Sequence, residues 1–182
     1  MTRDKERTRR AILDATESLV IERGTDASLA DIAKSAGVSK SGLLHHFPSR
    51  DALMHAMAVD VLERFRTAVH QRVDLSENRP GKLLRGYVRA LFDEEVASYA
   101  VLFPGFWGLL ASASDLTALS RDDEERWLSD LTADGLEPEL VTVVRFAAER
   151  AAATPPAELA VLSARQIDLY GTLLAMAEPD AG

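Results

Sequence analysis

SLADIAKSAGVSKSGLLHHF, residues 28–47, predicts two short helices joined by a tight turn. In the first helix, Ser28 and Asp31 have the spacing of a capping box, in which each side chain binds a backbone N–H of the other residue. The apolar residues then recur at helical spacing and form one face, which comprises Leu29, Ile32, Ala33 and Ala36. Gly37 follows where a left-handed residue commonly ends a helix, so the chain is expected to turn there.

The second helix of this pair has little to bury. Ser39 is a candidate N-cap, and only Leu43 and Phe47 are expected to face a core. The positions left without a core to fill are Lys40, Ser41, Gly42, Leu44, His45 and His46. A short helix with small, polar and cationic groups on its outer side is suited to the DNA major groove. Periodicity alone is equally consistent with a plain helical hairpin.

A long helix is predicted next, over residues 49–73. Its apolar residues keep a four-residue step and comprise Leu53, Met57, Val61, Phe65, Val69 and Val73. Arg50 lies in the first turn, where a cation interacts unfavourably with the helix dipole, and a phosphate facing Arg50 would explain its presence. Because so long a helix must leave the small N-terminal core, we expect it to link that core to the rest of the chain.

The remaining segments are helical in pattern as well. Residues 4–23 predict an amphipathic helix with a basic first turn. After a turn at 76–81, helices are expected near 80–98, 100–113, 115–133, 138–153 and 156–177. No segment alternates between apolar and polar residues with hairpin turns, so the sequence predicts an all-α fold of about nine helices.

Aromatic residues concentrate in the middle of the chain. Together with Phe65 of the long helix, these aromatic residues are candidate ligand contacts. They are Tyr87, Phe92, Tyr99, Phe103, Phe106, Trp107 and Trp127. Core packing explains such a set, and the alternative is a ligand cavity with apolar walls. The pair Pro104-Gly105 loosens the helix at the centre of the set. We therefore predict a pocket lined by these residues for a hydrophobic small molecule, and a carboxylate in the pocket would suit a cationic one.

The last two predicted helices suggest an association surface. Residues 156–177 carry a seam of Leu159, Leu162, Leu169, Leu173 and Met176. Residues 138–153 carry a flatter face of Leu140, Val144, Ala147, Ala148 and Ala151. Two such helices from each subunit would form a four-helix bundle in a homodimer. The alternative is that both faces are buried within one subunit.

Composition restricts the classes of function. The 182-residue chain has a net charge of −8, but residues 1–50 carry nine Lys or Arg and seven Asp or Glu, a net charge of +2. A mildly basic N-terminal part would turn toward a polyanion. The absence of cysteine excludes disulfides and thiolate metal sites. No apolar run approaches the roughly 20 residues of a membrane span, so we expect no membrane contact and a cytoplasmic location.

No set of residues suggests catalysis. The four histidines lack the spacing of a zinc-binding helix motif, and no glycine-rich phosphate loop is present. The acidic runs 93–95 and 122–125 are expected to be solvated, because adjacent charges point in different directions around a helix, although one residue of 93–95 could point into the cavity. We therefore predict no enzyme activity, no cofactor and no metal site.

With these residues in view, the chain resembles the TetR (tetracycline-repressor-like) family of transcriptional regulators. The resemblance is carried by RRAILDAT at 9–16 and by GTDASLADIAKSAGVSKSGLLHHFPSRDAL at 24–53. It implies a helix-turn-helix DNA-binding domain over residues 1–48 and a helical ligand-binding and dimerisation domain over 49–182. It also implies a homodimer on a palindromic DNA operator, and a repressor that a small-molecule ligand releases from that operator.

The resemblance also implies roles for single residues. Ser28 and Lys40 match positions that meet phosphate, and Arg50 stands where the family commonly has lysine. The positions that face bases or the groove are Ser39, Ser41, Gly42 and His45. Two positions depart from the family pattern, because Leu44 replaces the usual tyrosine and His46 replaces a tyrosine or phenylalanine. Leu44 cannot donate the hydroxyl bond to phosphate, although it could meet a thymine methyl group.

A second class of function stays open. A helical adaptor whose acidic body binds a protein, and whose N-terminal part has lost DNA, would fit Leu44 and the negative net charge. Such an adaptor would dimerise without protecting any operator.

Overall fold

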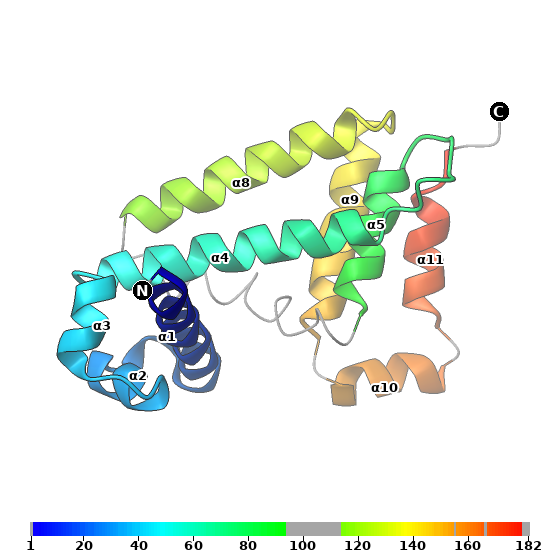
Figure 1. Ribbon diagram of the computed structural model, residues 1–182. Helices are drawn as coiled ribbons and strands as arrows, with labels where there is room; N and C mark the ends of the chain where they lie inside the picture. Colours follow the sequence, from blue (N-terminus) through cyan, green and yellow to red (C-terminus); the bar gives the residue numbers. More distant parts are fainter. Residues whose placement is uncertain (1, 94–113, 155, 166, 180–182) are drawn as a thin grey trace. The chain divides into compact units, whose positions relative to one another are not determined.

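The computed structural model describes residues 2–93, 114–154, 156–165 and 167–179 (Figure 1). Within these ranges it contains nine α-helices, one short 3₁₀ helix and no strand, which confirms the all-α prediction. The chain forms two compact units. Within the described residues the boundaries fall after Leu62 and after Leu119, so residues 114–119 belong to the first unit. The division of roles predicted at residues 48 and 49 stays a prediction.

The first unit contains the predicted helical pair. Its elements are α1 (Thr2–Arg23), the 3₁₀ helix η1 (Gly24–Asp26), α2 (Leu29–Ser35), α3 (Lys40–His46) and the start of α4 (Arg50–Gln71). Fully buried side chains of this core include Ile12, Leu13, Ile32, Leu43 and Leu53, so all four α-helices contribute to it. An ion pair of 2.5 Å between Arg10 Nη1 and Asp60 Oδ1 also ties α1 to α4.

The predicted capping box at the start of α2 and the predicted left-handed glycine after α2 are both present. Ser28 Oγ accepts a hydrogen bond from the Asp31 backbone N–H at 3.1 Å, and the Asp31 carboxylate accepts one from the Ser28 N–H at 3.2 Å. The hydrogen bonds from Ser28, its hydroxyl first, lower the pKa of Asp31. Gly37 has a φ of 68°, the left-handed conformation that its position requires.

The second unit contains the rest of α4 and the C-terminal helices. These are α5 (Lys82–Leu91), the greater part of α8 (Ser114–Thr132), α9 (Pro138–Ala152), α10 (Pro156–Ala164) and α11 (Leu169–Met176). Helices α5, α9 and α11 pack against one another (Figure 1). Their apolar faces, together with those of α4 and α8, close one core that includes Val69, Leu84, Leu131, Val144 and Leu173.

Helix α5 is shorter than the expected segment 80–98. It ends at Leu91, and Phe92 leaves helical geometry with its N–H bonded to Val88 O at 3.3 Å. Asp93 then pairs with Arg72 at 2.6 Å, which holds the chain end of α5 against the end of α4. The rest of that expected segment, and the helix expected near 100–113, fall outside the described residues.

The single helix expected over 156–177 is wrong, because the structure has two helices there. The Asp168 carboxylate accepts the Gly171 N–H at 2.9 Å and caps α11. The Ile167 N–H closes the end of α10 by bonding to Leu162 O at 3.0 Å. An aspartate that satisfies a first-turn N–H competes with continuation of the helix, and this local bond was not recognised in the apolar pattern.

The small-residue face expected on α9 is largely buried inside the subunit. Val144, Ala148 and Ala151 are buried, because α5 and α11 pack on that side of α9. Ala147 of that face is exposed, and the large apolar side chains that α9 exposes are Val143 and Phe146, which are 56% and 54% exposed. For Val144, Ala148 and Ala151, the alternative prediction that this face is buried within one subunit is therefore correct.

Candidate nucleic-acid interface and effector site

The start of α3 is organised by one hydroxyl group. Ser39 Oγ accepts the Gly42 N–H at 3.0 Å and lies 3.0 Å from Ser41 Oγ. A Cβ atom on Gly42 would come within 3.2 Å of Ser39 Oγ, a contact tighter than side chains usually make. Gly42 therefore leaves room for the cap, a role that the sequence analysis did not assign to it. The cap fixes the N-terminal turn that carries Lys40 and Ser41.

The outer side of α3 is a compact set of four exposed residues. These are Lys40, Ser41, Leu44 and His45. Leu43 is fully buried and anchors the opposite side of the helix. Because residues i, i+1, i+4 and i+5 share one side of a helix, the exposed four form a continuous surface. We call these four residues the α3 outer face.

His46 lies at the edge of this face and is only half-buried. Its ring meets the His45 ring edge-on, with 5.8 Å between the ring centroids. His46 Nδ1 is buried and has no hydrogen-bond partner in the described part of the chain. The histidine that replaces the family's aromatic residue therefore packs as a ring, as that aromatic would.

Two predicted phosphate-binding residues already make hydrogen bonds within the protein. The Ser28 hydroxyl donates to Asp31 Oδ2 at 2.6 Å while it also caps α2. The Arg50 guanidinium donates to the Ala27 backbone oxygen, so a buried carbonyl explains the cation in the first turn of α4. Phosphate contact by Ser28 and Arg50 stays a prediction that requires their remaining hydrogen-bonding capacity.

Several basic residues of α1 also take part in ion pairs or ring contacts within the protein. Arg7 pairs with Asp4, and Arg10 pairs with Asp14 and Asp60. The Arg9 guanidinium lies 5.2 Å from the centroid of the Phe47 ring. The basic N-terminal residues are thus part of α1, and from Arg9 onward they contact other elements of the first unit.

Three of the predicted effector residues form a closed aromatic cluster. The rings of Phe65, Tyr87 and Trp127 meet edge-on, with centroids 4.9 to 5.9 Å apart. None of the three is more than 2% exposed, so a ligand could reach them only if the rings separated. Core packing, the alternative explanation, accounts for their present positions.

Charged groups surround this aromatic cluster. The Tyr87 hydroxyl donates to Glu149 Oε1 at 2.6 Å, and Arg145 Nε lies 3.0 Å from the same oxygen. Burial raises the pKa of Tyr87 well above its usual value, and burial also raises the pKa of Glu149. The Arg66 guanidinium lies 3.9 Å from the Trp127 ring centroid. The cluster is therefore a core with internal ion pairs.

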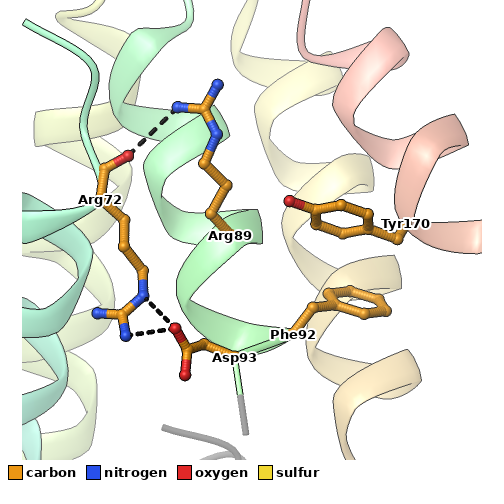
Figure 2. A pocket seen from close by; sticks show the side chains of 5 residues that line it. All are labelled: Arg72, Arg89, Phe92, Asp93 and Tyr170. Carbon is orange, nitrogen blue, oxygen red and sulfur yellow. Dashed lines mark hydrogen bonds and ion pairs between the residues drawn. The ribbon is translucent and has the colours of Figure 1, made fainter. Parts of the chain in front are cut away.

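Phe92 is the predicted effector residue that lines a pocket. The pocket has a volume of about 440 Å³, and its other lining residues are Arg72, Arg89, Asp93 and Tyr170 (Figure 2). Asp93 belongs to the acidic run of which one residue was expected to be able to point into the cavity. The other three were missed because they come from α5, α11 and the residue after α4, whose packing no single motif reveals. The remaining predicted effector residues, Tyr99, Phe103, Phe106 and Trp107, lie outside the described residues, as does Pro104-Gly105.

The described residues show neither a metal-binding group nor a membrane-spanning helix. No group of three or more His, Cys, Asp or Glu residues is placed to hold a metal ion there. None of the helices that the structure describes is long and apolar enough to cross a membrane.

Comparisons with known proteins cover both units. The model of the bacterial regulatory proteins, tetR family, matches residues 12–57, and the tetracyclin repressor-like C-terminal domain matches residues 81–178. The HTH-type transcriptional regulator BetI of Escherichia coli O127:H6 is 32% identical over 130 residues, which cover 69% of this chain and 67% of BetI.

Solved structures share the fold at lower identity. A transcriptional regulator from Rhodococcus sp. Rha1 is 20% identical, has a TM-score of 0.74, and matches 95% of this chain and 93% of its own. The ketosteroid transcriptional regulator KstR2 of Mycobacterium tuberculosis is 20% identical, has a TM-score of 0.63, and matches 90% of this chain and 93% of its own.

Proposed function

The chain belongs to the TetR family of bacterial regulatory proteins, and from this premise we propose that it is a dimeric repressor that a small molecule releases from its DNA operator. Regulators of this family bind DNA operators and small-molecule effectors and form dimers. The chain is accordingly a DNA-binding transcriptional regulator. Its operator, its effector and the surface through which it dimerises are the parts that we propose here.

The α3 outer face is the observation that carries the proposal. It presents one cation, one hydroxyl, one apolar side chain and one imidazole on a helix whose opposite side is anchored by Leu43. Lys40 supplies charge for a phosphate, while Ser41 and His45 can hydrogen-bond to base edges. Leu44 is 37% exposed and offers apolar contact to a thymine methyl group. These side chains cover both positioning on the duplex and base recognition.

Dimerisation is proposed through α9 and the pair α10 and α11. Val143 and Phe146 are large apolar side chains that α9 exposes, and Val161 on α10 is 55% exposed. Exposed apolar residues that gather on neighbouring helices commonly mark a protein interface. A homodimer would bury them and would space two copies of α3 for two half-sites of an operator.

In vitro selection from a random duplex library tests the DNA-binding function directly. We expect the full chain to enrich an inverted repeat whose half-sites lie about one or two helical turns apart. Protection of that selected duplex from cleavage should be symmetric about its centre. A library that shows no enrichment over random sequence at any salt concentration would overturn the proposal and would favour a protein-binding adaptor.

A further inference from the structure

The pocket of the second unit lies where three helices approach one another. Arg72 follows the last residue of α4, Arg89 and Phe92 lie at the end of α5, and Tyr170 lies in the first turn of α11. The volume of about 440 Å³ is within the range of sites that hold small organic molecules. All of its lining residues belong to one unit.

One side of the pocket is aromatic. The centroids of the Phe92 and Tyr170 rings are 5.3 Å apart, and the ring planes are inclined by 47°. Tyr170 is 39% exposed, and in the described part of the chain its hydroxyl has no hydrogen-bond partner. Figure 2 shows both rings on one side of the pocket, with the Tyr170 hydroxyl pointing toward the side that Arg72 and Arg89 occupy. This side suits a flat apolar body that places a polar group near that hydroxyl.

The other side of the pocket carries two guanidinium groups. Arg72 Nε and Nη2 donate to Asp93 Oδ2 at 3.0 and 2.6 Å, so Arg72 is neutralised by its own carboxylate. Arg89 Nη1 donates to Arg72 O at 3.2 Å, and Arg89 Nη2 donates to Glu77 Oε1 at 2.9 Å. Among the described residues, Arg89 Nε–H has no acceptor, and it can serve a ligand.

Among the described residues, the lining of the pocket holds two cations and one carboxylate. Glu77 accepts hydrogen bonds from the buried Arg85 as well as from Arg89, and Arg85 Nη1 also lies 3.6 Å from Glu178 Oε2. Asp74 is within electrostatic range of Arg89, but its Oδ1 accepts the N–H and the hydroxyl of Ser76. An anionic group is therefore favoured over a cationic one.

We infer that this pocket binds a flat aromatic anion of the aromatic carboxylate class. The aromatic body packs on Phe92 and Tyr170, while the carboxylate accepts hydrogen bonds from Arg89 and from the Tyr170 hydroxyl. The inference rests on the proposed function for its regulatory meaning, because such a ligand would be the effector. It also names the ligand's charge, which the aromatic residues of the sequence did not determine.

Three probes of nearly equal shape separate charge from stacking. Calorimetric titration of the full chain with naphthalene-2-carboxylate should give a Kd at least tenfold lower than titration with the neutral naphthalene-2-carboxamide. The carboxamide oxygen can also accept from Arg89, but an ionised acceptor strengthens that hydrogen bond by about this magnitude. Naphthalen-2-ylmethylammonium should bind most weakly. Equal affinity for the three probes, or preference for the ammonium, would overturn the inference.

Substitutions of the lining residues test whether the probe binds in this pocket. Arg89→Met should remove the tenfold preference for the carboxylate and leave carboxamide affinity within about twofold. Tyr170→Leu should weaken both probes by about fivefold, the value of one aromatic contact, and should weaken the carboxylate further because its hydroxyl bond is lost. Ile21→Ala removes an exposed apolar side chain of α1 in the first unit, outside the pocket, and it should change neither Kd. Since Tyr170 is partly exposed, its variant tests the site even if Arg89→Met fails to fold. Unchanged binding in Tyr170→Leu would place the probe elsewhere and refute the assignment.

DNA binding is measured in parallel on the same proteins without any probe. Wild-type chain that selects an operator but shows no charge preference among the probes would refute the pocket and leave the regulator intact. Chain that binds naphthalene-2-carboxylate with the expected variant pattern but never selects a duplex would support the site and refute the regulatory function. The two failures are thus distinguishable.

Discussion

Replacing Lys40 by alanine gives the most direct measurement of how α3 meets DNA. Lys40 is exposed at the first position of α3, and no ion pair or hydrogen bond of its ammonium group is found among the described residues. Ser39 caps the helix through its own hydroxyl, so Lys40→Ala leaves the cap in place. Removing a cation from a helix N-terminus also relieves an unfavourable interaction with the helix dipole. We therefore expect no loss of folding stability.

The expected magnitude follows from counterion release. Each phosphate neutralised by a cation contributes about 0.9 to the slope of log Kobs against log salt concentration, so a dimer that loses two lysines loses about 1.8. Between about 50 and 200 mM salt, the deficit of Lys40→Ala relative to wild type should then shrink about twelvefold. The weakening should be nearly equal for the selected duplex and for random duplex, because a phosphate contact carries no sequence information.

Fluorescence anisotropy of a labelled selected duplex over a salt series provides the assay. Lys82→Ala is the matched control, because Lys82 lies on α5 in the other unit and its loss changes the net charge equally. The control should keep the wild-type slope. A Lys40→Ala slope equal to wild type, or an equal loss in Lys82→Ala, would refute phosphate contact by Lys40.

Three further substitutions probe other parts of the structure. Leu44→Tyr should raise operator affinity about tenfold through a hydroxyl bond to phosphate, with an unchanged salt slope; weaker binding in anisotropy would instead indicate that Leu44 contacts a base. Glu77→Gln should lower the free energy of unfolding by about 3 kcal/mol near pH 7, because Arg85 is only 1% exposed and loses the carboxylate 2.6 Å from it, while Glu178 remains 3.6 Å away. The pKa of Glu77 is lowered by Arg89 first and then by Arg85, so its contribution is present above the ordinary pKa of 4.5 and is lost as pH falls through the lower folded value; urea unfolding that differs equally from wild type at every pH would contradict this linkage. Tyr87→Phe should cost about 2 kcal/mol in the same measurement, since the hydroxyl bonds to a partly buried carboxylate at 2.6 Å, and an unchanged midpoint would contradict that value.

Local chemistry was readable from the sequence wherever one residue acts on its neighbours. The capping box of Ser28 and Asp31, the left-handed Gly37 and the cap at Ser39 are all present as predicted. Each depends on hydrogen bonds or dihedral angles within four residues. The Asp168 cap depends on equally local bonds, and it was missed because the apolar seam of 156–177 continues across it.

Contacts between distant segments were the part that the sequence left open. The sequence did not reveal that Arg50 donates to the Ala27 carbonyl, which lies 23 positions away in the chain. Nor does composition distinguish a closed aromatic cluster, as Phe65, Tyr87 and Trp127 form here, from an open one. Only the packing of α4, α5, α8 and α9 decides whether those rings enclose space.

The sequence by itself determined the all-α class, the helical pair at 28–47 and the family, because helical periodicity, caps and turn residues act over a few positions. The tertiary structure decided which aromatic residues are sealed in the core. It also decided that Arg89, Phe92 and Tyr170 meet around a pocket. Burial and charge pairing depend on side chains brought together from separate helices, and their relative positions exist only after the helices have packed.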